Sequence, residues 1–73
     1  MIVLQQWLIE QRQVKNLTLE QLAEQLNKSV SYVQDVESGQ YQLDVVEYLF
    51  YCKALEINPN LGLELIQSNL PSI

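Results

Sequence analysis

The side chains that most often perform catalysis or bind metals are scarce in this chain. It has 73 residues, no histidine and one cysteine, Cys52. Without histidine, neither the usual transition-metal ligand sets nor a Ser-His-Asp triad can be assembled. The two glycines, Gly39 and Gly62, are too far apart in the sequence for a glycine-rich phosphate loop. We therefore expect no enzyme activity, no metal and no cofactor, and look for a binding surface instead.

Composition indicates one small domain with an ordinary core. Almost half of the residues are apolar, and only two are glycine and two proline, so a compact helical core is expected without disulfides. A single cysteine fits a reducing compartment, and Cys52 is expected to be a small buried hydrophobe. No stretch is long and apolar enough to cross a membrane, and residues 1–4 are too short for a signal peptide. The sequence predicts a cytoplasmic protein.

Hydrophobic spacing places helices along the middle of the chain. Apolar residues recur at helical intervals on either side of a polar break at residues 27–29: Leu19, Leu22, Ala23 and Leu26, then Val30, Val33 and Val36. Two amphipathic segments joined by a few turn residues form a helix-turn-helix corner.

Capping signals set the expected helix ends. Asn16 ends a first helix over 4–14, and Thr18 with Gln21 forms a capping box for a second helix that runs to residue 26. Ser29 or Ser31 caps a third helix, and Gly39 follows its end. A fourth helix begins at Asp44 and runs to residue 55, and a turn at 58–60 precedes a last helix that Pro71 ends. We expect an all-α fold, with a core over 1–57 and a C-terminal helix of the same domain within 58–73.

Several short motifs resemble the XRE family, the Cro and phage-repressor type of helix-turn-helix. The resemblance spans 8–57, about two thirds of the chain. Its pieces are Leu17-Thr18, Leu22-Ala23, Ser29-Val30-Ser31-Tyr32-Val33 and Glu37-Ser38-Gly39, followed by 43–48 and 52–55. It implies a five-helix phage-repressor-like domain that binds double-stranded DNA with its third helix in the major groove.

The resemblance also implies which residues contact DNA. Val30, Ser31 and Asp35 occupy the positions that meet bases, and Tyr32 and Gln34 flank them toward phosphate. Core packing is an equal alternative for Val30, and for Asp35 a solvated charge is favoured over a base contact, because phosphates repel a carboxylate. The full set of expected DNA contacts is Lys28, Ser29, Val30, Ser31, Tyr32, Gln34, Asp35, Gln40, Tyr41 and Gln42.

Positive charge is low for a protein that binds DNA. Nine carboxylates outnumber four cations, and the net charge is −5. The resemblance pairs Arg12 with Glu37 in a structural ion pair, which leaves Lys15, Lys28 and Lys53 for phosphates. Neutral amides and backbone N–H groups at helix starts also bind phosphate. The sequence therefore predicts modest DNA affinity.

Aromatic and apolar residues near the C-terminus suggest an interface. Phe50 is expected on the outer side of the fourth helix, opposite a buried face that includes Val45, Leu49 and Cys52. The last helix either covers the open end of the core or contributes to a dimer. The expected dimer interface comprises Tyr48, Phe50, Tyr51, Leu65 and Ile66.

Two functions are consistent with these features. The first is a sequence-specific transcriptional regulator, such as a repressor, that binds a short palindromic DNA site as a homodimer. The alternative is an acidic helix-turn-helix interaction module, antitoxin-like or anti-repressor, that binds a protein partner and has little affinity for DNA.

Overall fold

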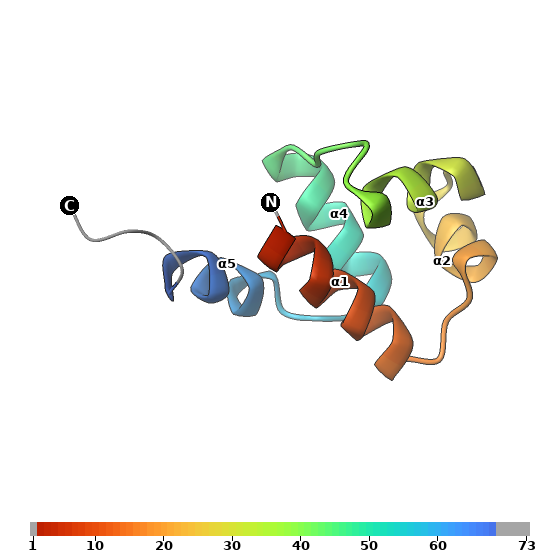
Figure 1. Ribbon diagram of the computed structural model, residues 1–73. Coiled ribbons are helices and arrows are strands. Elements are labelled where there is room, and N and C mark those ends of the chain that lie inside the picture. The colour runs from red at the N-terminus through yellow and green to blue at the C-terminus, as the bar shows by residue number, and fades with distance from the viewer. Residues whose placement is uncertain (1, 69–73) are drawn as a thin grey trace.

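Residues 2–68 are described by the computed structural model and form an all-α domain (Figure 1). The helices are α1 (Ile2–Val14), α2 (Leu19–Leu26), α3 (Val30–Ser38), α4 (Val45–Leu55) and α5 (Pro59–Ser68). The expected five-helix fold is confirmed. Pro71, expected to end the last helix, lies outside the described residues. Within residues 2–68, none of the helices has the length and hydropathy needed to cross a membrane.

Side-chain caps fix the starts of the three central helices. Thr18 Oγ1 accepts a hydrogen bond from the Gln21 N–H at 3.0 Å, and Gln21 Oε1 accepts one from the Thr18 N–H at 2.9 Å. Ser29, and not Ser31, caps α3 by accepting from the Tyr32 N–H. Asp44 caps α4 and forms a second capping box with Glu47. These bonds satisfy N–H groups that a helix start otherwise leaves without a partner.

A residue with a left-handed backbone conformation follows each of the first three helices. Asn16 and Asn27 have φ of 58° and 57°, and Gly39 has φ of 86°. Glycine adopts this conformation without the steric cost that a Cβ brings, so Gly39 lets the chain turn sharply out of α3. A Cβ there would also lie 3.1 Å from Gln5 Nε2.

The core lies where α1, α2, α3 and α4 meet. Its buried members are Leu8, Leu22, Ala23, Val33, Val36, Tyr48, Tyr51, Cys52 and Leu55. Burial also raises the pKa of the Cys52 thiol, which keeps the sulfur protonated and unreactive. The expectation of a buried cysteine is confirmed.

The C-terminal helix α5 packs against α1 and α4, at the opposite end of the molecule from α2 (Figure 1). Tyr48 of α4 donates a hydrogen bond from its hydroxyl to the Pro59 carbonyl oxygen at 2.6 Å. Gly62 is buried at this contact, and a Cβ on it would lie 2.8 Å from Trp7 Cζ3. Glycine thus allows α5 to approach the core closely enough to cover its end.

The expected buried face of α4 was correct for Cys52, which is buried, and wrong for Val45 and Leu49. Val45 and Leu49 are 74% and 46% exposed, whereas Tyr48 and Tyr51 are 4% and 0% exposed. Apolar side chains occur all round this helix, so their spacing cannot select one face. The tertiary contacts with α2 and α5 select the side that carries Tyr48, Tyr51, Cys52 and Leu55.

Candidate nucleic-acid interface

The solvent-facing side of α3 is polar. Val33 and Val36 anchor the helix in the core, and Ser31, Gln34 and Asp35 are exposed on its outer side. The first turn of α3 carries no acidic residue, so the positive end of its dipole is not neutralised by a side chain of that turn. Val30 is half-buried and packs against the core, as in the packing alternative for this residue.

An ion pair fixes the far end of α3 against α1. Arg12 Nε lies 2.7 Å from Glu37 Oε2, and Arg12 Nη2 lies 3.2 Å from Glu37 Oε1. The same guanidinium donates from Nη1 to the Leu17 carbonyl oxygen at 2.8 Å. Both side chains are largely buried, at 15% and 14% exposed. The pair joins α1 to the last turn of α3, and its bidentate guanidinium contact holds both the orientation and the distance of the two helices.

A loop places three further expected contacts beside α3. Gln40, Tyr41 and Gln42 are exposed, and the Tyr41 N–H donates to the Asp35 carbonyl oxygen at 3.1 Å. The backbone bond draws the loop alongside the last turns of α3. Lys28 and Ser29 are exposed at the other end of that helix. Apart from Val30 and Tyr32, which are half-buried, all the expected DNA contacts are therefore exposed.

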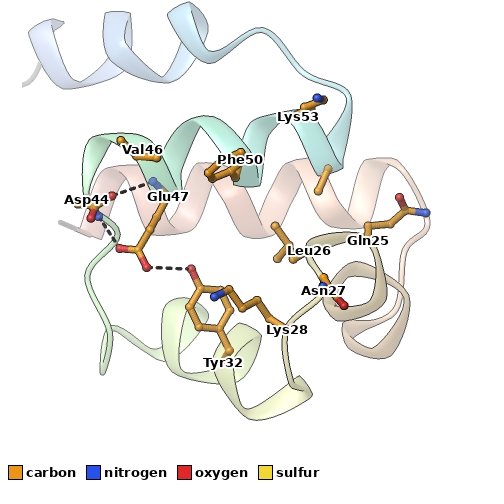
Figure 2. A pocket seen from close by; sticks show the side chains of 11 residues that line it. Gln25, Leu26, Asn27, Lys28, Tyr32, Asp44, Val46, Glu47, Phe50 and Lys53 are labelled. Carbon is orange, nitrogen blue, oxygen red and sulfur yellow. Dashed lines mark hydrogen bonds between the residues drawn. The ribbon is translucent and has the colours of Figure 1, made fainter.

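Tyr32, Tyr41, Glu47 and Lys28 form a cluster between α3 and α4, which we call the tyrosine cluster. The Tyr32 and Tyr41 hydroxyls both donate to Glu47 Oε2, the first at 3.5 Å. Their ring centroids lie 5.2 Å apart, and Lys28 Nζ lies 5.5 Å from the centroid of the Tyr32 ring. Figure 2 shows Glu47 between Asp44 and Tyr32, with Lys28 alongside the ring.

The electrostatics of the tyrosine cluster follow from these contacts. Partial burial and the neighbouring Glu47 carboxylate raise the pKa of Tyr32 to about 12. The hydrogen bond to Glu47 raises the pKa of Tyr41, and the same bond, with that from the Asp44 N–H, lowers the pKa of Glu47. At neutral pH the carboxylate is charged and both phenols keep their protons.

Glu47 was not among the residues expected at the site. The signal was present, because Asp44 and Glu47 have the three-residue spacing of a capping box. That pattern identifies a helix start, however, and the contact of Glu47 with Tyr32 and Tyr41 depends on how α3 packs against α4.

A shallow groove of about 630 Å³ runs beside this cluster, between the α2–α3 turn and α4 (Figure 2). Phe50 and Lys53 border it on α4, and Leu26 and Lys28 border it on the other side. Lys15 lies elsewhere, with its Nζ 3.5 Å from the Glu56 carbonyl oxygen. Of the three lysines, only Lys28 adjoins the start of α3.

The expected dimer interface needs correction. Tyr48 and Tyr51 belong to the core, so their rings are not available at the surface. Phe50 is 61% exposed, and Leu65 and Ile66 are half-buried on α5. The exposed apolar side of α4, which we call the α4 face, consists of Val45, Val46, Leu49 and Phe50.

Comparison with known proteins agrees with this architecture. A sequence model of the helix-turn-helix family matches residues 8–61. An XRE-family-like protein from Pseudomonas syringae pv. tomato superposes with a TM-score of 0.84 at 28% identity, covering 93% of this chain and 85% of that one. The restriction-modification controller protein C.AhdI from Aeromonas hydrophila superposes with a TM-score of 0.76 at 36% identity, covering 84% of this chain and 92% of that one.

The search of curated protein sequences gave no match. The family model alone spans more than half of the chain, and its limits enclose α2, α3 and α4. The chain belongs to the XRE family and carries the helix-turn-helix of a DNA-binding transcription regulator.

Proposed function

We propose that this protein is a sequence-specific transcription regulator that reads DNA with α3 and binds its site as a homodimer. The observation that carries the proposal is the polar outer side of α3, which lies on a helix held at its far end by Arg12 and Glu37. In the major groove, such a side can meet base edges directly. The protein would act in the cytoplasm, where it meets its DNA.

Three exposed side chains of α3 have a suitable base partner. The Ser31 hydroxyl can donate or accept, the Gln34 amide can form two hydrogen bonds with adenine, and the Asp35 carboxylate can accept from the amino group of cytosine. The start of α3 adds a positive helix end for a phosphate. These are contacts of modest strength, because only Lys28 adds a full positive charge close to them.

Modest contacts from one subunit favour a symmetric dimer. Two copies double the number of phosphate and base contacts, and their third helices must lie about 34 Å apart to read successive major grooves. The α4 face supplies four large exposed apolar side chains on one helix. Apolar patches of this kind are typical of protein interfaces, and we assign the α4 face to the second copy of the chain.

Selection of genomic fragments by the purified protein at low salt tests the proposal. One enriched palindromic sequence is expected for the wild type. Gln34→Ala should weaken binding to that fragment or change its preferred bases, whereas Gln13→Ala, an equal truncation at an exposed position of α1, should not. No enriched sequence, or equal effects of the two variants, would overturn α3 as the reading helix.

The acidic balance favours a second candidate, an interaction module that binds a basic protein partner. Its support is the net charge of −5 together with the α4 face. Such a module would give no enriched DNA fragment, and its complex with a basic protein would weaken with added salt, because charges at a solvated rim are screened.

A further inference from the structure

Glu47 uses both of its carboxylate oxygens within the protein. Oε1 accepts a hydrogen bond from the Asp44 N–H at 3.0 Å, which completes the cap of α4. Oε2 accepts from the hydroxyls of Tyr32 and Tyr41. One side chain in the first turn of α4 therefore holds a phenol from α3 and a phenol from the loop that follows it.

These hydrogen bonds affect what the two tyrosines can offer to DNA. A phenol has one proton to donate, and a phosphate oxygen can only accept. While Tyr32 and Tyr41 donate to Glu47, neither can donate to a phosphate. The Glu47 carboxylate also places a negative charge beside the residues proposed to face the DNA backbone, where it repels phosphate.

We infer that Glu47 restrains DNA affinity by holding the hydroxyl protons of Tyr32 and Tyr41 and by adding its own charge to the DNA-facing surface. Phosphate competes with Glu47 for these two protons whenever DNA is bound. The inference rests on the proposed DNA binding and names the residue that sets its strength. Glu47 is a positioning residue for the two phenols, and its charge also acts on phosphate at a distance.

A neutral substitution can separate this role from the capping of α4. Gln21 forms the same capping box in α2 through its side-chain amide oxygen. Glu47→Gln should therefore keep the start of α4 while it removes the charge and weakens the hold on the phenols. Glu64→Gln makes the same change of net charge at an exposed position of α5, and it serves as the control for a general charge effect.

The experiment measures the affinity of each variant for the fragment that the wild type selects. Glu47→Gln should bind about three- to tenfold more tightly, the effect of one removed repulsion and one or two released donors. Glu64→Gln should stay near the wild type. Tyr41→Phe should weaken binding more in the Glu47→Gln background than in the wild type, because only there is the Tyr41 proton free to reach a phosphate.

Tyrosine ionisation without DNA gives an independent readout. The ultraviolet titration of Glu47→Gln should show two phenols that ionise at lower pH than in the wild type, because their charged acceptor has gone. Tyr32→Phe and Tyr41→Phe identify which phenols shift. Circular dichroism checks that the helices are retained.

Three results would overturn the inference. The first is a folded Glu47→Gln that binds DNA no better than the wild type. The second is a Tyr41→Phe substitution that weakens binding equally in the wild type and in Glu47→Gln. If no variant binds DNA although the phenols shift as expected, the proposed function fails and the inference fails with it. If the wild type binds and only the variant series disagrees, the proposed function stands and the role of Glu47 does not.

Discussion

At the scale of single residues, the ion pair of Arg12 and Glu37 holds the end of α3 against α1. Their side chains are 15% and 14% exposed, so the loss of one partner leaves a charge in a poorly solvated place. We expect Glu37→Ala to lower the free energy of unfolding by about 3 kcal/mol. Denaturant unfolding measures this, with Glu24→Ala at an exposed position of α2 as the control. Equal losses in the two variants would contradict a structural role for the pair.

Tyr48 and Tyr51, two buried tyrosines of α4, allow a matched test of how much a buried hydroxyl contributes to the free energy of unfolding. The Tyr51 hydroxyl is buried with no hydrogen-bond partner among the described residues, whereas Tyr48 donates to the Pro59 carbonyl oxygen. We expect Tyr51→Phe to leave the free energy of unfolding unchanged or to raise it by about 1 kcal/mol, because an unpaired polar group is removed. Tyr48→Phe should lower it by about 1 kcal/mol. The opposite order in thermal or denaturant unfolding would show that Tyr51 has a partner.

The sequence could indicate individual residues only where a local pattern or a family pattern defines their role. Arg12 and Glu37 are 25 residues apart, and the resemblance to a known family, not any local rule, brought them together. The contacts of Glu47 with Tyr32 and Tyr41 lacked such a precedent. They required the packing of α3 against α4, which side-chain spacing does not describe.

At the scale of elements, the helix starts were the most predictable feature. Thr18 with Gln21, and Asp44 at the start of α4, act through hydrogen bonds within three residues, so their signals lie in the local sequence. The orientation of α4 was not predictable. Apolar residues surround it, and only the contacts with α2 and α5 decide which of them are buried.

The α4 face carries a prediction about assembly. If it joins two copies, Phe50→Glu places a carboxylate in an apolar interface and should convert a dimer into monomers at micromolar concentration. Val14→Glu makes a comparable change at another exposed apolar residue, 71% exposed on α1, and should leave the mass unchanged. Light scattering or sedimentation measures both. A wild type that is monomeric at tens of micromolar would show that the second copy does not bind at this face.

At the scale of the whole molecule, all four tyrosines share one response to pH. The pKa of Tyr32 is raised to about 12, and burial or hydrogen bonding also raises the pKa values of Tyr41, Tyr48 and Tyr51. Above the ordinary tyrosine pKa of about 10, the unfolded chain loses protons that the folded chain retains, so the free energy of unfolding falls as pH rises. Thermal unfolding should show a small loss of stability from about pH 8.5, where the Cys52 thiol of the unfolded chain ionises but the buried thiol does not, and a steeper loss between about pH 10 and 12, where the phenols do the same. A flat profile across the alkaline range would contradict the burial of these phenols.

Low positive charge predicts an unusually weak dependence of DNA binding on salt. Three lysines per subunit remain beside the paired Arg12. At about 0.9 per neutralised phosphate, a dimer should give a slope of log K against log salt concentration near −5 or shallower. Titrations of the selected fragment at several salt concentrations measure the slope. A value steeper than about −9 would mean that an additional basic surface contacts the DNA.

Because Cys52 is buried, the rate at which its thiol reacts reports how often the folded domain opens. It is the chain's only cysteine, its side chain is fully buried, and burial raises the pKa of its thiol. A thiol-specific reagent can therefore reach the sulfur only when the helices around it separate. The labelling rate follows the fraction of opened molecules without an added probe. Any molecule that binds only the folded domain must slow that labelling in proportion to its occupancy, so this one sulfur atom can report binding by a DNA fragment or by a protein partner alike.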